Sequence, residues 1–193
     1  MKKQQENKNI IILASGNGSN FEAIVNHIRQ ENLPITVEML VTNNPEAFAI
    51  IRAERLGIPF KIIDSRKFRS RSEYNRALDE FLSLIEFDLM VLAGYMMILP
   101  AFIVRKYWRR IVNIHPSLLP AFPGLHAIEK AFEYGVKVTG VTVHFVDEGV
   151  DTGPIISQEC VKIDKNDTLK TLEEKIHRVE HKIYIEAIKK VLF

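Results

Sequence analysis

An amide and an imidazole two residues apart form the part of this chain best suited to chemistry. Asn113 and His115 end an apolar run, residues 111–115, that has the length and composition of a strand. In an extended chain, residues i and i+2 point to the same side, so one face presents an amide donor beside a ring that can carry a proton. Pro116 then stops the strand. Such a pair suits the stabilisation of an oxyanion with proton transfer alongside it.

No serine, cysteine or lysine nucleophile accompanies the pair, so the sequence predicts that a substrate supplies the attacking group. Two downstream residues each allow both a structural and a functional interpretation. His144 lies in an alternating run, where it is either a satisfied strand residue or part of the site. Asp151 precedes Thr-Gly-Pro and is either a turn former or a partner of the ring. His181, farther along, is expected to be a neighbour of a site or a surface group.

A glycine-rich loop, Ser-Gly-Asn-Gly-Ser-Asn at residues 15–20, joins the first predicted strand to the first predicted helix. Glycines let the backbone approach a ligand, and unpaired N–H groups at a helix start attract anions. A Walker loop is excluded because Gly-Lys-Ser/Thr is absent. A dinucleotide fingerprint is not matched, because Phe21 replaces its third glycine and residues 42–44 lack the expected acid. The loop predicts a site for a single phosphate monoester, with an unliganded turn as the alternative.

The composition is that of an ordinary globular domain. The 193 residues are enough for one domain with a full core, and a net charge of +2 from 26 basic and 24 acidic residues does not indicate a nucleic-acid binder. Basic residues gather at 66–71 and 105–110, and most are expected to be solvated surface. The single cysteine, Cys160, excludes an internal disulfide and a multi-thiolate metal site; within its strand-like run it is expected to be buried.

Targeting signals are not evident. Residues 1–8 form a polar N-terminal tail without the apolar core of a signal peptide. No apolar run approaches the ~18 residues of a membrane span. A cytoplasmic protein that does not bind a membrane is therefore expected.

Short apolar runs alternate with amphipathic segments, a pattern that favours a parallel sheet flanked by helices. Strands are predicted at 9–14, 36–42, 60–63, 89–93 and 111–115, with helices near 21–29, 46–56, 71–84 and 100–107. Beyond them follow a loop at 119–124, a helix at 127–134, an antiparallel or edge strand at 138–145, a strand at 155–163 and a helix at 169–192. Thr168 and its two predecessors cap that last helix. The prediction is one α/β domain, residues 9–193, with a mostly parallel twisted sheet of about seven strands and a long C-terminal helix.

Several segments together resemble the phosphoribosylglycinamide formyltransferase family: residues 15–20, 92–96, 113–120, 123–126 and 143–154. The Asn-Ile-His-Pro-Ser-Leu-Leu-Pro block and the later Asp-Thr-Gly-Pro resemble the pattern shared by formyltetrahydrofolate-using enzymes. The glycine-rich loop and Phe-Pro-Gly-Leu-His at 122–126 resemble the glycinamide enzymes more specifically. The resemblance extends from Asn9 to about Ile188. It implies a Rossmann-like sheet with its active site at the C-terminal ends of the strands.

The resemblance also implies an activity and its residues. The family transfers a formyl group from 10-formyltetrahydrofolate, a co-substrate, to glycinamide ribonucleotide in purine synthesis, and needs no metal. Asn113, His115 and Asp151 would be the catalytic trio. Residues expected to bind the ribonucleotide are Gly18, Ser19, Asn20, His177 and Glu180. Those expected to bind the folate are Arg71, Met96, Met97, Ile98, Leu99, Asp147, Glu148, Gly149 and Val150, with Asn113 and Asp151.

Three positions depart from the family pattern. Met97 replaces a common arginine, Ala121 stands where a basic residue is frequent, and His177 replaces a glutamine that often supports the ribonucleotide. These departures concern individual substrate contacts and leave the trio intact. The N-terminal part of the domain would then bind the ribonucleotide, and the C-terminal part would bind the folate and carry out catalysis.

Rival functions remain at this level. A formyltetrahydrofolate hydrolase usually carries an extra N-terminal domain and a methionyl-tRNA formyltransferase an extra C-terminal RNA-binding domain, and 193 residues are expected to leave room for neither. A phosphate-binding module without catalysis is the alternative from another class, and the trio argues against it. The expected partners are two small-molecule substrates rather than a nucleic acid, and the sequence makes no prediction of the oligomeric state.

Overall fold

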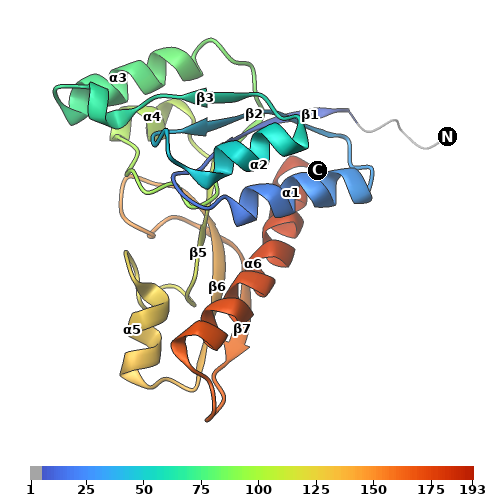
Figure 1. Cartoon of the computed structure of the whole chain (residues 1–193), viewed down its shortest axis with the longest axis vertical. Helices are drawn as coiled ribbons and strands as arrows, with labels where there is room; N and C mark the ends of the chain where they lie inside the picture. The colour runs from blue at the N-terminus through green and yellow to red at the C-terminus, as the bar shows by residue number, and fades with distance from the viewer. Residues whose placement is uncertain (1–5) are drawn as a thin grey trace.

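A seven-stranded sheet runs through the computed structural model, which describes residues 6–193, in the order β3-β2-β1-β4-β5-β6-β7 (Figure 1). The strands are β1 (Lys8–Leu13), β2 (Ile35–Thr42), β3 (Phe60–Ile62), β4 (Leu89–Leu92), β5 (Ile111–His115), β6 (Val138–Phe145) and β7 (Ile155–Lys162). Neighbours from β3 to β5 pair in parallel, and β6 and β7 pair antiparallel. The predicted mostly parallel α/β sheet is confirmed.

Within the described residues, six helices cover the two faces of the sheet. They are α1 (Ser19–Gln30), α2 (Phe48–Leu56), α3 (Arg71–Leu82), α4 (Ala101–Lys106), α5 (Ala127–Tyr134) and α6 (Leu169–Leu192), with a 3-10 turn, η1 (Ser65–Lys67). Alternation along β1 sends Ile10 and Ile12 into a core shared with α1, α2, α5 and α6. Ile11 and Leu13 enter a second core with α3 and α4. Each such buried side chain contributes about 1.5–3 kcal/mol, which explains why a two-sided apolar strand lies at the centre.

Local chemistry shifts some element ends from their predicted positions. α1 begins at Ser19, two residues earlier than predicted, because Gly18 adopts a left-handed φ of 74° as its N-cap. α2 begins two residues later, at Phe48, because the Asn44 side chain accepts a hydrogen bond from the Glu46 amide and forms a turn first. At the other end of the chain, Thr168 caps α6 as predicted, in a reciprocal capping box with Thr171.

Two further predictions are corrected. Lys8, assigned to the polar tail, is the first residue of β1, while residues 1–5 of that tail lie outside the described part of the chain. Cys160, predicted to be buried, is exposed, because β7 is the edge strand of the sheet and presents this face to solvent. Within residues 6–193, no helix combines the length and apolar character needed to cross a membrane.

The strand order fixes where a ligand can bind. From β1 the chain proceeds outward to β2 and β3, and then returns to β4 on the other side of β1. In open sheets of this kind, the crevice at the carboxyl ends of the strands beside such a reversal receives the ligand. Tyr184 on α6 fixes the long helix to this end of the sheet, because its fully buried hydroxyl lies 2.9 Å from Leu92 O and 3.1 Å from Val112 O.

Candidate active site

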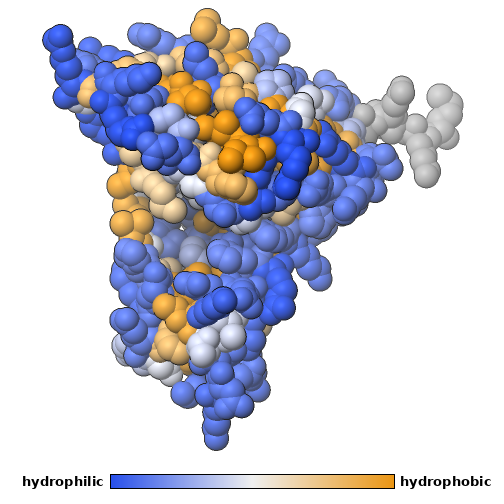
Figure 2. Space-filling model, viewed as in Figure 1, coloured by the Kyte–Doolittle hydropathy of each residue, from blue (hydrophilic) through white to orange (hydrophobic). Residues whose placement is uncertain are grey.

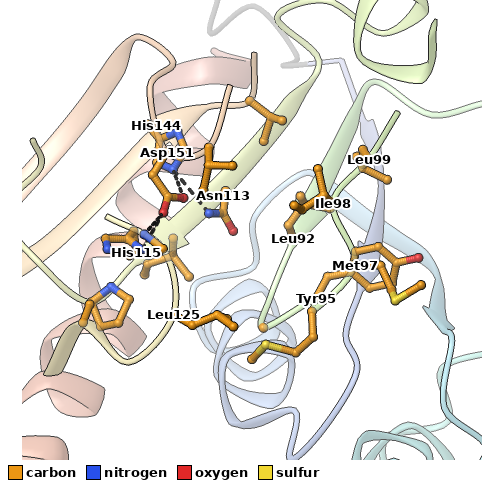
Figure 3. A pocket seen from close by; sticks show the side chains of 18 of the residues that line it. Leu92, Tyr95, Met97, Ile98, Leu99, Asn113, His115, Leu125, His144 and Asp151 are labelled. Carbon is orange, nitrogen blue, oxygen red and sulfur yellow. Dashed lines mark hydrogen bonds and ion pairs between the residues drawn. The ribbon is translucent and has the colours of Figure 1, made fainter. Parts of the chain in front are cut away.

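A cavity of about 350 Å³ opens at the carboxyl ends of β4 and β5, and Figure 2 shows the surface hollowed between the upper and lower parts of the molecule. Figure 3 shows its polar side, where Asn113, His115, His144 and Asp151 converge. Opposite them lie Tyr95, Met97 and the other residues that follow β4. The predicted trio therefore meets in one cavity, together with every residue predicted to bind folate except Arg71 and Glu148.

The pairing of His115 with Asp151 is direct. His115 ends β5 with 5% of its surface exposed, and its Nδ1 lies 3.3 Å from Asp151 Oδ2. Its other ring nitrogen, Nε2, lies 2.8 Å from the Phe122 carbonyl oxygen, which can only accept, so Nε2 carries a hydrogen. Both ring nitrogens thus face acceptors, an arrangement that suits the charged imidazolium.

Asp151 is held as a carboxylate by its surroundings. Burial would raise the pKa of this carboxyl, but contacts outweigh it: the approach of His144, a hydrogen bond from the Gly124 amide at 2.8 Å, and the positive charge of a protonated His115. The net effect places the pKa of Asp151 below its ordinary value. A negative charge is therefore fixed beside the ring at neutral pH.

His144 belongs to this cluster, which decides the question that the sequence left open. β6 pairs antiparallel with β5 so that His144 lies directly opposite Asn113. His144 Nδ1 lies 2.9 Å from the Phe145 carbonyl and carries a hydrogen, while its Nε2 lies 3.6 Å from Asp151 Oδ1 and 3.3 Å from Asn113 Nδ2. This contact orients the Asn113 amide. The alternation of residues 138–145 placed His144 on one face of a strand, but only the pairing register brings it to Asn113.

Three of the residues predicted to bind folate form an apolar rim together with Leu125, for which the sequence made no such prediction. Met96, Ile98, Leu125 and Val150 line the cavity with 67%, 65%, 67% and 50% of their surfaces exposed, and we call these four residues the apolar rim. Leu99, by contrast, is buried in the core. Arg71 stands behind the rim at the start of α3, where its Nη2 donates to Ile98 O at 2.6 Å and its Nη1 lies 3.7 Å from the Met97 sulfur. The Arg71 side chain therefore supports segment 96–99 by bonding to the main chain of that segment.

The second loop of the cavity is internally bonded. Asp147 Oδ1 accepts hydrogen bonds from the Gly149 amide at 3.1 Å and from the Thr152 hydroxyl at 2.8 Å. Glu148 forms a bidentate salt bridge with Arg105 of α4, in which Arg105 Nε donates to Oε1 at 2.6 Å and Nη2 to Oε2 at 2.7 Å. The loop that carries Asp151 is thus fixed at both its start and its end.

The residues predicted to bind the ribonucleotide gather at a separate place, between α1 and α6. Asn20 Nδ2 donates to Glu180 Oε2 at 3.1 Å, and His177 Nδ1 lies 2.9 Å from the same oxygen. This hydrogen bond with Glu180 raises the pKa of His177 above its ordinary value. Asn20 is 91% buried, yet its Oδ1 has no hydrogen-bond partner among residues 6–193. With Gly18 and Ser19 on the same helix start, these residues form a polar cluster outside the cavity lining.

His181, one residue beyond Glu180, proves to be a neighbour of this cluster rather than a surface group. Its Nε2 is buried and has no hydrogen-bond partner within the described chain. Burial lowers the pKa of His181 below its ordinary value, and the nearby His177, His27 and Arg52 act in the same direction against Glu180.

Gly18 has a packing role that the sequence did not reveal. A Cβ at this position would lie 2.7 Å from the Ala49 Cβ of α2, and the backbone already has a positive φ. The loop is also joined to the cavity by Ser15, whose hydroxyl donates to Asn43 Oδ1 at 2.6 Å and accepts from the Met96 amide at 2.8 Å. Within the described chain, no group of three or more His, Cys, Asp or Glu side chains is arranged to hold a metal ion.

Comparisons with known proteins agree with this fold and identify a family. The family model described as formyl transferase matches residues 8–188. Phosphoribosylglycinamide formyltransferase of Bacillus subtilis is 48% identical over 185 residues, 96% of this chain and 95% of that protein. A crystal structure of phosphoribosylglycinamide formyltransferase from Bacillus halodurans has a TM-score of 0.91 and 48% identity, covering 96% of this chain and 95% of that one. The human trifunctional purine biosynthetic protein adenosine-3 is 40% identical over 97% of this chain, which spans 19% of that protein.

Proposed function

The chain belongs to the formyl transferase family, and from that premise we propose that it transfers the formyl group of 10-formyltetrahydrofolate to the amine of glycinamide ribonucleotide in purine biosynthesis. The observation that carries the proposal is the meeting of Asn113, His115 and Asp151 in one cavity at the carboxyl ends of the strands. The relatives of matching length, which carry the name of this activity, support it over the other enzymes that handle formyl groups.

The reaction needs an oxyanion site and one proton transfer. The amine of the ribonucleotide attacks the formyl carbon, a new C–N bond forms, and the carbonyl oxygen becomes negatively charged. Asn113 donates a hydrogen bond to this oxygen, and protonated His115 supplies a positive charge beside it. A donor of this kind typically contributes about 10²–10³ in rate.

Collapse of the intermediate breaks the bond between the formyl carbon and the folate nitrogen. The proton lost by the attacking amine reaches that leaving nitrogen, so the charges of reactants and products balance. Asp151, which faces His115 at 3.3 Å, favours the charged form of the ring during this step and assists the transfer directly or through water. Since the substrate provides its own nucleophile, the protein contributes positioning and charge.

The two substrates would occupy the two groups of polar residues. The ribonucleotide phosphate would bind the amides at Gly18, Ser19 and Asn20, at the start of α1, with His177 and Glu180 contacting the same substrate from α6. The folate would cover the apolar rim and contact segment 96–99 and loop 147–151. The N-terminal part of the domain would thus hold the acceptor, and the C-terminal part the donor and the catalytic residues.

An assay of the purified chain with both substrates tests the proposal. We expect formylated ribonucleotide to accumulate only when 10-formyltetrahydrofolate and glycinamide ribonucleotide are both present, and His115→Ala to abolish most of it. Release of formate without the ribonucleotide, at the same rate as with it, would instead identify a hydrolase. Phosphate-loop binding of the ribonucleotide without product would indicate a binding module.

A further inference from the structure

Two main-chain groups of one loop contact both members of the His115–Asp151 pair. The Phe122 carbonyl accepts from His115 Nε2 at 2.8 Å, and the Gly124 amide donates to Asp151 Oδ2 at 2.8 Å. The same Oδ2 lies 3.3 Å from His115 Nδ1. The contacts therefore close a ring that runs from His115 to Asp151, to Gly124, along the chain to Phe122 and back to His115.

We propose that the main chain of residues 122–124 is a clamp that positions the His115–Asp151 pair, and that turnover depends on its left-handed backbone conformation. The inference rests on the proposed function, in which this pair performs the proton transfer. Phe122 and Gly124 act through the pair, and are positioning residues rather than catalytic ones.

The backbone of the clamp has an unusual conformation for its sequence. Phe122 has a φ of 51° and Gly124 a φ of 77°. A positive φ is uncommon for a bulky residue, and Pro123 restricts the preceding residue further towards extended conformations. Residues held in such regions cluster at functional sites, where the surrounding structure enforces them.

The surroundings of Phe122 do enforce it. The Ser117 hydroxyl donates to the Ala121 carbonyl at 2.5 Å, which fixes the loop just before Phe122. The Phe122 ring meets the Tyr134 ring of α5 edge-on, with centroids 6.0 Å apart. An extended Phe122 would turn its carbonyl away from His115, because the carbonyl direction follows the backbone dihedrals.

The clamp determines where the proton of His115 resides. With Nε2 donating to a carbonyl, the remaining nitrogen, Nδ1, is the one presented to Asp151 and exchanges the proton. The Gly124 amide occupies one lone pair of Asp151 Oδ2 and prevents the carboxylate from turning. A carboxylate and a ring that are both held in this way keep the separation that proton transfer requires.

Gly124→Ala tests the clamp with an unusually close control, Gly135→Ala. Both glycines have nearly the same φ, 77° and 79°, and at neither does an added Cβ meet any atom within 4 Å. Gly135 follows the last residue of α5. It does not line the cavity and does not contact the His115–Asp151 pair. The two substitutions therefore impose the same backbone penalty at a clamp residue and at a residue outside the clamp and the cavity lining.

We expect Gly124→Ala to lower kcat by about 10- to 100-fold, with smaller changes in KM for either substrate, because the misplaced pair acts in the chemical step. Gly135→Ala is expected to lose thermal stability by a similar amount and to keep its kcat. Gly124→Asn should retain more kcat than Gly124→Ala, because asparagine tolerates a positive φ although it is larger. The ¹⁵N NMR signals of the His115 ring should shift in Gly124→Ala and stay unchanged in Gly135→Ala.

The inference is overturned if Gly124→Ala and Gly135→Ala keep the same kcat and the same His115 ring signals in an active enzyme. It is also overturned if Gly124→Asn is less active than Gly124→Ala, since steric obstruction would then explain the loss. Failure of the wild-type chain to transfer a formyl group would contradict the proposed function instead, and the ring signals would still report whether the clamp exists.

Discussion

The polar centre of the cavity and its apolar rim are built in opposite ways. In the polar centre, which comprises Asn113, His115, His144 and Asp151, each side chain is already bonded to another protein group. The apolar rim, by contrast, has large side chains with half or more of their surface exposed. The protein has therefore completed the arrangement needed for chemistry and has left the burial of the rim to the ligand.

This difference assigns the energetic roles. Dipoles and charges fixed before the reaction need no reorganisation when charge develops, so the polar centre acts on the transition state. Apolar surface contributes roughly 25 cal/mol per Å² on burial, whichever state of the substrate covers it, so the rim acts on binding. Substitutions in the centre should consequently change kcat, and those at the rim should change KM.

The largest expected effect, and the sharpest test of this contrast, is that of Asp151→Asn. Asp151 has a φ of 56°, which asparagine tolerates, so the fold should be kept. The neutral amide cannot stabilise a charged His115, and kcat should fall on the order of 10²–10³ with little change in KM for either substrate. Steady-state kinetics with each substrate varied would measure this. A loss confined to KM would place Asp151 with the rim and break the comparison.

A smaller effect is expected from Arg71→Ala, behind the rim. Removing the guanidinium releases the Ile98 carbonyl and loosens segment 96–99. Loss of one hydrogen bond of about 1 kcal/mol should raise KM for the folate several-fold, while KM for the ribonucleotide stays constant. Arg69→Ala is the control, since Arg69 is an exposed residue of the same basic segment. Equal effects of the two substitutions would return Arg71 to the solvated surface.

The smallest effect concerns stability rather than activity. The hydrogen bond between His177 and Glu180 raises the pKa of His177 in the folded state. The pair therefore contributes its full stabilisation below the unfolded-state pKa of about 6.5, and this contribution is lost as the pH rises through the higher folded-state pKa. His177→Gln should therefore flatten the dependence of unfolding free energy on pH from neutral to mildly alkaline conditions. Urea titrations of both proteins over about pH 5 to 9 would measure it. Parallel curves would show that His177 does not change protonation on unfolding.

Sequence alone predicted the elements well because their signals are local. Alternation, glycine and proline positions and the Thr168 cap depend on a few neighbouring residues. The i, i+2 relation likewise placed Asn113 and His115 on one face, and the structure confirms it. His144 could not be assigned, because its meeting with Asn113 depends on the register between β5 and β6. The exposure of Cys160 depends on which strand forms the sheet edge, again a property of the whole fold.

The conformation of the loop at residues 122–124 could not be predicted from the sequence either. The rule for residues before proline predicts an extended Phe122, whereas contacts from Ser117 and Tyr134 hold it in the left-handed region. Tertiary contacts decide such positions, and these are the positions where the site departs from local expectation.

The Ser15 hydroxyl bonds both Asn43 and the Met96 amide, and so ties together the ends of β1, β2 and β4. The glycine loop cannot shift relative to segment 96–99 without breaking the partly buried hydrogen bond between the Met96 amide and the Ser15 hydroxyl. In the proposed reaction, the distance from a bound phosphate to the formyl carbon is therefore set by the spacing of the strand ends in the sheet. The acceptor is then selected by the distance between its phosphate and its amine. If that distance were one or two bonds shorter or longer, the acceptor would still bind through its phosphate, but its amine would not reach the formyl carbon.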